Sequence, residues 1–248
     1  MRTCGARARC SAANALLKKR GAEQLRLVGR RGLVHKCGMI TVHHLDNSRS
    51  QRILWLLEEL GLEYSIVFHK REQSGFAPAS LKAVHPLGKA PVVDLDGQIV
   101  AESGAAVELI TQRYGQGRLM PATDSADYAR YIEWLHYPEG SVSLATSMTL
   151  FGRVFRVDNA LYKGYVQSQV DLHLSYITAT LEGRQFLVGT TLTAADIQLT
   201  FTLQAARRSK LLEAYPSLLA YLDRMEARDA YKRGVEKGGP FTLKLGSS

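Results

Sequence analysis

The sequence predicts a small mixed α/β domain followed by an all-helical domain. Three observations lead to this prediction. Strand-like and helix-like segments alternate as βαβ and then ββα between residues 40 and 114. The dipeptide Asp96-Gly97 separates two apolar runs, which is typical of a tight antiparallel hairpin. Beyond Asp124 the sequence contains apolar stripes at helical spacing and no convincing strand pattern.

The first three elements form a βαβ unit. Residues 40–45, ITVHHL, are a short β-branched strand, and residues 64–68, YSIVF, are the second strand. Between them, residues 50–60 form an amphipathic helix that Gly61 ends. The apolar positions of this helix are Ile53, Leu56, Leu57 and Leu60. Two strands joined by a helix in one sheet are parallel, with a right-handed crossover.

The ββα unit follows a polar loop. A short helix within residues 80–88 comes first and is ended by its proline and glycine. The hairpin strands are residues 91–95 and 98–101, and a helix over residues 103–114 stops at Gly115. We therefore expect a small mixed sheet in which the hairpin pair is antiparallel.

The second half contains only helical patterns. A turn-rich segment, residues 115–126, links it to the first half, and apolar stripes occupy residues 194–207 and 217–227. The longest stripe consists of Val166, Val170, Leu174, Ile177 and Leu181. Thr193 and Asp196 form a T-x-x-D capping box, which we interpret as structural.

Charge and cysteine both separate residues 1–38 from the rest of the 248-residue chain. This segment holds ten basic side chains and one acid, Glu23, which accounts for the whole formal charge of +9. All three cysteines also lie in it: Cys4, Cys10 and Cys37. We interpret it as a disordered basic tail, either an amphipathic targeting peptide or, as we favour, upstream sequence before a true start at Met39. The predicted domains are residues 39–117 and 124–240.

Charge, apolar runs, and the positions of cysteine and histidine restrict the class of protein. The nucleic-acid signal belongs to the tail alone, so we expect no nucleic-acid partner. No run of 18 apolar residues suits a membrane span. The body lacks cysteine, which removes disulfides and thiolate nucleophiles and is compatible with a cytoplasmic location. His43 and His44 alternate on one strand without a partner at metal spacing, so we interpret both as structural and expect no metal.

Four sequence motifs make the chain resemble a known protein family. They are SRSQR at residues 48–52, HPLGKAPVVDLDG at 85–97, IVAESGAAVELI at 99–110 and LTAADI at 192–197. In this order and spacing the chain from Met39 to about Lys237 resembles cytosolic glutathione S-transferases, most closely bacterial members with serine-type thiolate activation. The resemblance implies a thioredoxin-like glutathione-binding domain, an all-α C-terminal domain and a homodimer. It does not extend to residues 1–38.

The resemblance also implies a site for glutathione as co-substrate. In the family the proline matching Pro91 is cis, which lets the backbone of Ala90 pair with the cysteinyl part of the tripeptide. Glu102 would accept the γ-glutamyl ammonium, and Ser103 with the free amides of a helix start would bind its carboxylate. Lys89 would reach the glycyl carboxylate. The alternatives remain that Pro91 is an ordinary strand-edge residue, Ser103 a simple cap and Lys89 a solvated side chain.

The polar turn before the first helix is the candidate for thiol activation. A free thiol has a pKa near 8.5, so a transferase must stabilise the thiolate. Ser48 lies four residues before Arg52, as in serine-type members, and is our candidate donor to the sulfur. Asn47 is the alternative donor, and either side chain could instead only cap the helix. Tyr137, on the first helix of the second domain, is the candidate for the electrophile pocket.

The sequence therefore predicts a cytoplasmic, homodimeric glutathione transferase that attacks a small hydrophobic electrophile in detoxification, without a metal. Two alternatives stay open. A glutathione-dependent disulfide reductase or peroxidase would use the same thiolate, and a non-catalytic module for glutathione or another ligand would keep the fold without turnover.

Overall fold

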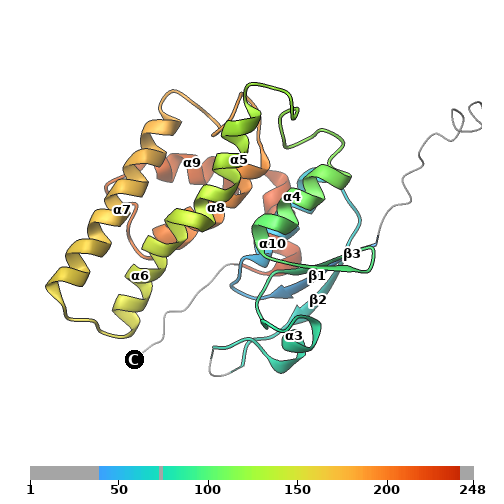
Figure 1. Cartoon of the computed structure of the whole chain (residues 1–248), viewed down its shortest axis with the longest axis horizontal. Helices are drawn as coiled ribbons and strands as arrows, with labels where there is room; N and C mark the ends of the chain where they lie inside the picture. The colour runs from blue at the N-terminus through green and yellow to red at the C-terminus, as the bar shows by residue number, and fades with distance from the viewer. Residues whose placement is uncertain (1–38, 73–74, 241–248) are drawn as a thin grey trace, which may run out of the picture. The chain divides into compact units, whose positions relative to one another are not determined.

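The computed structural model describes residues 39–72 and 75–240, so the predicted tail of residues 1–38 lies outside the described residues. A four-stranded sheet comes first in this part of the chain (Figure 1). Its strands are β1 (Ile40–Leu45), β2 (Ser65–His69), β3 (Val92–Leu95) and β4 (Gln98–Ala101). The helices among them are α2 (Ser50–Leu60), α3 (Ala79–Val84) and α4 (Ser103–Tyr114). The predicted βαβ-ββα order is confirmed.

Helices alone follow, as the sequence predicts, and no described residue after β4 belongs to a strand. They are α5 (Tyr128–Tyr137), the π-helical turn η1 (Pro138–Val142), α6 (Ser143–Val154), α7 (Ala160–Leu181), α8 (Ala194–Arg208), α9 (Pro216–Glu226) and α10 (Asp229–Gly238). Through η1 the chain passes from α5 into α6 without a break. Within the described ranges, no helix has the length and apolar character to cross a membrane.

The sheet has the strand order β2-β1-β3-β4. β1 pairs parallel with β2, and β3 pairs antiparallel with both β1 and β4. Asp96 and Gly97 join the hairpin at φ angles of 57° and 88°, the positive values that a two-residue type I′ turn requires. Both predictions for the sheet are thus confirmed.

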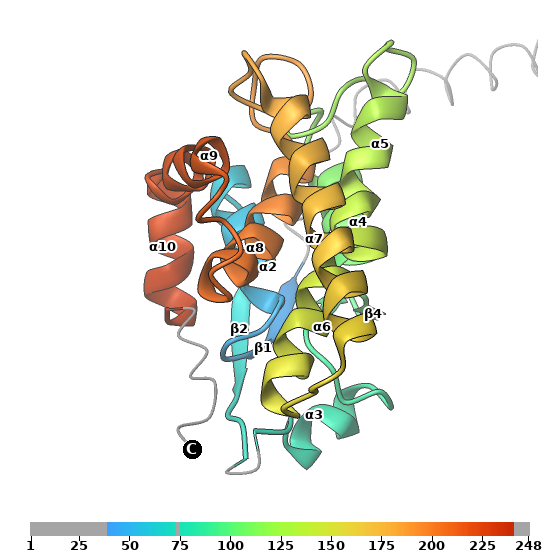
Figure 2. The same ribbon diagram turned by 90° about the vertical axis from the view of Figure 1, so that its left-hand side faces the viewer.

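Helix α2 is buried on almost every side, which the prediction of an amphipathic helix did not capture. Ten of its eleven residues are buried. The sheet covers one face, α4 and α8 cover others, and α10 packs along the length of the helix (Figure 2). Polar side chains of α2, among them Arg52 and Glu58, are therefore buried and must find partners inside the protein.

Glu58 joins α2 to the C-terminal helix. Its carboxylate accepts hydrogen bonds from Tyr64, Arg233 and Lys237 at 2.7, 2.8 and 2.5 Å. Burial alone would raise the pKa of Glu58, but these donors outweigh it and hold the pKa at about 2. The carboxylate is therefore ionised at neutral pH and ties α10 to α2.

The close approach of α10 depends on small residues. Ala230, Gly234 and Gly238 recur every four residues and are the buried positions of α10. A Cβ at Gly234 would lie 3.1 Å from the backbone nitrogen of Trp55, and one at Gly238 would collide with Leu54. At this separation the carbonyl oxygen of Gly238 lies 2.8 Å from Nε2 of His44, a side chain of β1.

The capping box at the start of α8 is present. Thr193 donates to Asp196 Oδ2 from both its backbone nitrogen and its hydroxyl, each at 2.9 Å. The other carboxylate oxygen accepts from the Leu187 amide at 2.9 Å and from the Tyr221 hydroxyl at 2.8 Å. The box is structural, as predicted, and also holds the preceding loop and α9.

We expect Gly234→Ala to lower the free energy of unfolding by about 1 to 3 kcal/mol, because the methyl group would press on the α2 backbone. Gly164→Ala is the matched control, since Gly164 is an exposed helical glycine with nothing within 4 Å of its would-be Cβ. That change should raise stability by about 0.5 to 1 kcal/mol. Denaturant unfolding measures both, and equal stability of the two variants would contradict a close α2–α10 contact.

Candidate functional site

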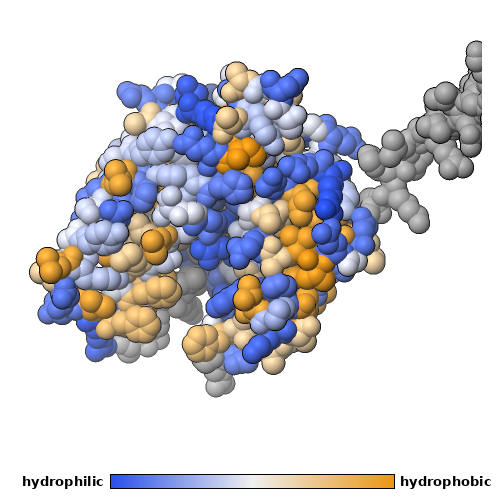
Figure 3. All heavy atoms as spheres, in the orientation of Figure 1, coloured by the Kyte–Doolittle hydropathy of each residue, from blue (hydrophilic) through white to orange (hydrophobic). Residues whose placement is uncertain are grey.

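Two neighbouring cavities open at the start of α2. The larger, of about 700 Å³, lies between the β1–α2 turn, the loop before α3, and helices α6 and α8. The smaller, of about 220 Å³, lies between the loop before β3 and the start of α4. Arg49, Lys89 and Ala90 line both cavities, so the two are contiguous. Figure 3 shows the surface hollowed between the helical part on the left and the sheet-bearing part on the lower right.

Seven of the eight site residues predicted from the sequence line these cavities. They are Asn47 and Ser48 in the larger cavity, Pro91, Glu102 and Ser103 in the smaller, and Lys89 and Ala90 in both. These residues come from three separate stretches of sequence. The fold therefore brings together the candidate thiol-activating turn and the candidate tripeptide subsites.

Tyr137 lines neither cavity. Its hydroxyl lies 2.7 Å from His173 Nδ1, and its ring packs against Trp134 and Tyr176. Burial, with the nearby Tyr176 and Glu133, raises the pKa of Tyr137 to about 12. The structure thus places this side chain in an aromatic cluster between α5 and α7 and does not bring it to the other candidate residues.

The β1–α2 turn presents Ser48 at the wall of the larger cavity. Ser48 Oγ accepts a hydrogen bond from the Ser50 amide at 3.2 Å and lies 2.7 Å from Ser50 Oγ. No side chain caps α2 at its N-cap position, Arg49. Ser48 therefore organises the turn through its neighbour while its hydroxyl stays beside the cavity.

Arg71, which also lines the larger cavity, holds the same turn. Its guanidinium donates to the backbone carbonyls of Asp46, Asn47 and Gly75 at 3.0, 3.2 and 2.9 Å. Asn47 has a φ of 54°, a left-handed conformation that asparagine tolerates better than most residues. The turn that carries Ser48 is thus fixed on both sides.

The backbone of the smaller cavity has two unusual conformations. The peptide bond between Ala90 and Pro91 is cis, as the resemblance implies. Glu102 has φ 71° and ψ 120°, outside the regions that a residue with a side chain normally adopts. Such a conformation costs of order 1 to 3 kcal/mol and persists where surrounding structure enforces it. It places Glu102 at the cavity immediately before the first residue of α4.

A buried cation, Arg52, lies behind the smaller cavity. Its Nη1 atom is 2.7 Å from Glu139 Oε1 and donates to Ser103 Oγ at 3.1 Å. It also hydrogen-bonds to the side chain of Gln198, and its guanidinium lies over the Phe201 ring, 4.6 Å from the centroid. Burial lowers the pKa of Arg52 to about 10, so the group stays charged at neutral pH. Ser103 is therefore held by Arg52, and no side chain caps α4.

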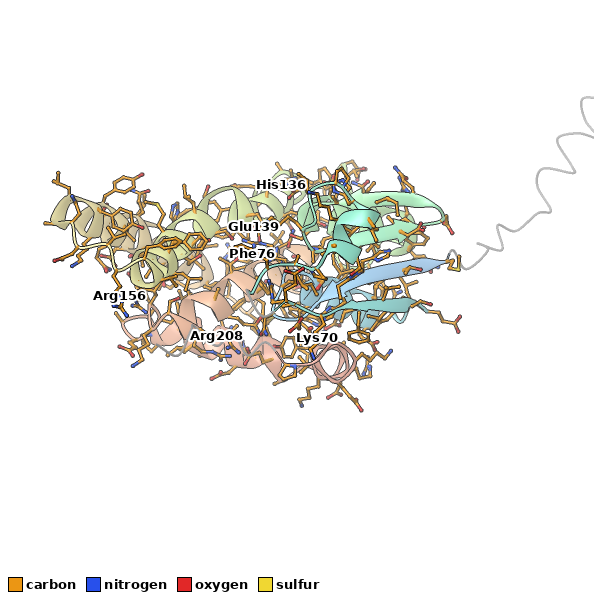
Figure 4. The ribbon with its side chains drawn as sticks, turned by 90° about the horizontal axis from the view of Figure 1, so that it is seen from below. Lys70, Phe76, His136, Glu139, Arg156 and Arg208 are labelled. Atoms are coloured by element: carbon orange, nitrogen blue, oxygen red, sulfur yellow. The ribbon has the colours of Figure 1, made fainter. Side chains whose placement is uncertain are left out.

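Glu139, on η1, is the shared counter-ion of Arg49 and Arg52, and the three side chains together keep a net positive charge. Its carboxylate pairs with Arg52 and, through the other oxygen, with Arg49 Nε at 2.8 Å. Burial alone would raise the pKa of Glu139, but the two guanidinium groups outweigh it and lower the pKa. Figure 4 shows Glu139 on the helical segment just beyond His136.

Sequence reasoning missed Glu139 and Arg49. The one local sign of an irregular helix beside Glu139 was Pro138. A proline inside a helical pattern lacks the backbone amide that regular α-helical hydrogen bonding needs. In the structure Pro138 is the first residue of the π-helical turn η1, and such turns are often found at functional sites. Helix α6, which follows, was also not predicted as a separate element.

The outer wall of the larger cavity combines hydroxyl and apolar groups. Its hydroxyls come from Ser143, Thr146, Ser147 and Thr202, and its large apolar groups from Phe76, Leu150, Phe151 and Phe201. Among the described residues, Thr202 Oγ1 is buried with no hydrogen-bond partner. Figure 4 labels Phe76 on the loop of the sheet-bearing part. This wall suits a largely apolar ligand that carries a polar group.

Comparisons with known proteins identify the family. The chain from residue 38 to 112 matches the family model for the N-terminal domain of glutathione S-transferase, and residues 152–233 match one for its C-terminal domain. Glutathione S-transferase 3 of Schizosaccharomyces pombe is 34% identical over 221 residues, which cover 84% of this chain and 91% of that protein. This chain belongs to the glutathione S-transferase family. It is an enzyme of that family, with the family's thioredoxin-like and helical domains.

Further glutathione S-transferases are similar to this chain in sequence and in structure. Glutathione S-transferase 1 of Saccharomyces cerevisiae is 30% identical over 223 residues, covering 80% of this chain and 95% of that protein. A glutathione S-transferase structure from Actinobacillus pleuropneumoniae superposes with a TM-score of 0.76 at 37% identity, covering 84% and 95% of the two chains. Within the described residues, no group of three metal-ligating side chains is placed to hold an ion.

We expect Glu139→Gln to lower the free energy of unfolding by about 3 kcal/mol at neutral pH, because Arg52 would stay buried without its counter-ion. The folded-state pKa of Glu139 lies below its unfolded value of about 4.3, so its contribution is complete above that value. It is lost as the pH falls through the lowered folded pKa.

Denaturant unfolding of wild type and Glu139→Gln between pH 7 and pH 3 measures this dependence. The stability difference should be largest at pH 7 and shrink below about pH 4. A difference that is constant with pH would mean that Glu139 acts through packing alone.

Proposed function

We propose that this enzyme binds glutathione across the smaller cavity, activates its thiol as a thiolate at Ser48, and adds the thiolate to a small hydrophobic electrophile. The observation that carries the proposal is the contiguity of the two cavities. Arg49, Lys89 and Ala90 line both cavities, so the Glu102-Ser103 subsite in the smaller cavity adjoins the larger cavity, which Ser48 lines. A tripeptide with a central thiol would span this arrangement.

The charged groups of the γ-glutamyl end of glutathione match the polar groups that line the smaller cavity. The ammonium of this end needs an acceptor, which the Glu102 carboxylate supplies, and its carboxylate needs donors. Ser103 and the free amides of the α4 start supply these, and the buried Arg52 adds positive charge behind Ser103. The backbone of Ala90 pairs with the cysteinyl residue, and Lys89 binds the glycyl carboxylate.

The thiol then lies at the start of α2. A donor from Ser48 and the positive end of the helix both favour the charged sulfur. Lowering a thiol pKa by about two units needs roughly 2.7 kcal/mol, which one charged hydrogen bond and a helix terminus can supply together. Asn47, which lines the same cavity, is the competing donor.

The electrophile fits the larger cavity, whose phenylalanines offer an apolar surface beside the thiol position. A disulfide reductase or peroxidase activity would use the same thiolate, and a panel of aryl halide, disulfide and hydroperoxide substrates separates these chemistries. The absence of turnover with all three would favour a non-catalytic binding module. We further propose a cytoplasmic homodimer with a role in detoxification.

Glu102→Gln should weaken glutathione binding more than it weakens folding, because it removes the charge that meets the ligand ammonium. A charged hydrogen bond contributes about 1.5 to 3 kcal/mol, so the affinity should fall about tenfold to a hundredfold. Calorimetric titration with glutathione measures the loss, and Glu108→Gln on the outer part of α4 is the control. Unchanged affinity with a lowered melting temperature would assign Glu102 a purely structural role.

Ser48→Ala should raise the pKa of bound glutathione by about one unit, equivalent to about 1.4 kcal/mol, with little change in affinity. The substitution removes a donor to the sulfur and leaves the other subsites intact. Thiolate absorbance in the ultraviolet, followed against pH for wild type, Ser48→Ala and Asn47→Ala, gives each midpoint. A shift in Asn47→Ala alone would make the amide the donor, and no shift in either would leave the helix start as the activator.

A further inference from the structure

A chain of buried hydrogen bonds leads from the proposed thiol position into the protein. Ser48 Oγ lies 2.7 Å from Ser50 Oγ, which lies 2.9 Å from His44 Nδ1. On its far side, His44 Nε2 lies 2.8 Å from the carbonyl oxygen of Gly238 at the end of α10. Ser48 is 9%, Ser50 0% and His44 2% exposed, so the chain meets solvent only at its Ser48 end.

The Gly238 carbonyl fixes the direction of this chain. A carbonyl oxygen only accepts, so His44 Nε2 carries the hydrogen and donates it. In a neutral imidazole, Nδ1 is then the acceptor, and Ser50 donates to it at 2.9 Å, a shorter contact than the 3.2 Å to its other acceptor, the Leu45 carbonyl oxygen. Ser50 Oγ in turn accepts the hydrogen of Ser48. With His44 neutral, the Ser48 hydrogen points inward and a lone pair of its oxygen is left for a donor in the cavity.

We propose that the thiol proton of bound glutathione passes through Ser48 and Ser50 to His44 Nδ1. This proposal rests on the proposed function and specifies where the proton goes. The S–H bond breaks and Ser48 Oγ takes that proton, while Ser48 gives its own hydrogen to Ser50 and Ser50 gives its own to Nδ1. The products are a thiolate and an imidazolium, and both hydroxyls are regenerated.

Proton transfer reverses the hydrogen bonds between the sulfur, Ser48, Ser50 and His44 Nδ1, while His44 Nε2 goes on donating to the Gly238 carbonyl. The imidazolium Nδ1–H now donates to Ser50, Ser50 donates to Ser48, and Ser48 donates to the thiolate. The reversal therefore turns the Ser48 hydrogen toward the sulfur, as thiolate stabilisation requires. When His44 is neutral, Ser48 donates its hydrogen to Ser50 and cannot donate it to the sulfur. Ser48 can therefore stabilise the thiolate only after His44 has taken up a proton.

The surroundings of His44 keep its ring neutral before glutathione binds, because burial lowers its pKa more than the Gly238 carbonyl and the Asp46 carboxylate raise it. In the complex, the negative charge of the thiolate would add to these two groups and favour the imidazolium. The other elements around the ring present no further charge in the described contacts: β2 offers the edge of Phe68, and α2 offers Ser50. The Leu45 amide donates to Ser50 Oγ at 3.3 Å and holds it in line.

His43 provides an internal contrast. It lies on the same strand but faces the other side of the sheet, where its Nδ1 is 3.1 Å from His69 Nε2. His69 in turn contacts Ser80 on α3. Burial lowers the pKa of His43 as well, and its described contacts do not lead to Ser48, so His43→Gln is the matched control.

The test measures how many protons are released to the buffer for each thiolate formed when glutathione binds. Glutathione binding to the full-length protein at pH 7 is measured by titration calorimetry in buffers of different ionisation enthalpy, with S-methylglutathione as the reference that lacks a thiol proton. The ultraviolet absorbance gives the amount of thiolate formed. We expect wild type and His43→Gln to form thiolate while releasing far less than one proton per thiolate, because His44 retains it.

His44→Gln should behave differently. Glutamine can still donate to Gly238 and accept from Ser50, but it cannot hold the proton, so any thiolate formed must release about one proton each and its midpoint must rise. Release of one proton per thiolate in wild type would overturn the relay while leaving the activation site intact. No thiolate in wild type would overturn both proposals, and the wild-type count decides even if His44→Gln does not fold.

Discussion

The buried guanidinium of Arg52 is the interaction on which the arrangement of the site depends. A charge in the interior is tolerated only when it is neutralised and hydrogen-bonded, and its partners come from three different elements. Glu139 belongs to η1, Ser103 to α4 and Gln198 to α8. One cation on α2 thus requires the helical part and the sheet-bearing part to meet in a single arrangement. The same requirement places the proposed carboxylate subsite beside the cavity wall.

The other side of α2 is fixed by contacts of a different kind. Glycines allow α10 to approach until its backbone carbonyl at Gly238 reaches His44, and Glu58 adds charged hydrogen bonds to the same helix. Hydrophobic packing joins these contacts, since a single buried cluster contains residues from Ile40 to Ala230. The first turn of α2 is therefore supported from β1, α8 and α10 at once. A site built on so constrained a turn needs little reorganisation when charge develops on the sulfur.

The sequence allowed prediction of those features whose signals are local. Gly61, Asp96-Gly97 and the Thr193 capping box act within a few residues, and each defines an element boundary that the structure has. What could not be predicted depends on tertiary contacts. Glu139 is 90 residues from Arg49, and Gly238 is 194 residues from His44, so no local pattern connects them. His44 was accordingly interpreted as structural, and the aromatic pattern around Tyr137 gave no indication that its ring turns toward α7.

The π-helical turn η1 has a consequence for how the cavity can diversify. A π turn accommodates one residue more than regular α-helix, and each residue turns the following helix by about 100°. Ser143, Thr146 and Ser147 face the larger cavity in the register that η1 sets. Loss of one residue from η1 would leave both flanking helices intact but present a different face of α6 to the ligand. A change of one residue in the length of η1 would therefore alter which side chains α6 presents to the cavity, and it would also have to be matched in the core, where Val142 and Ala145 are buried.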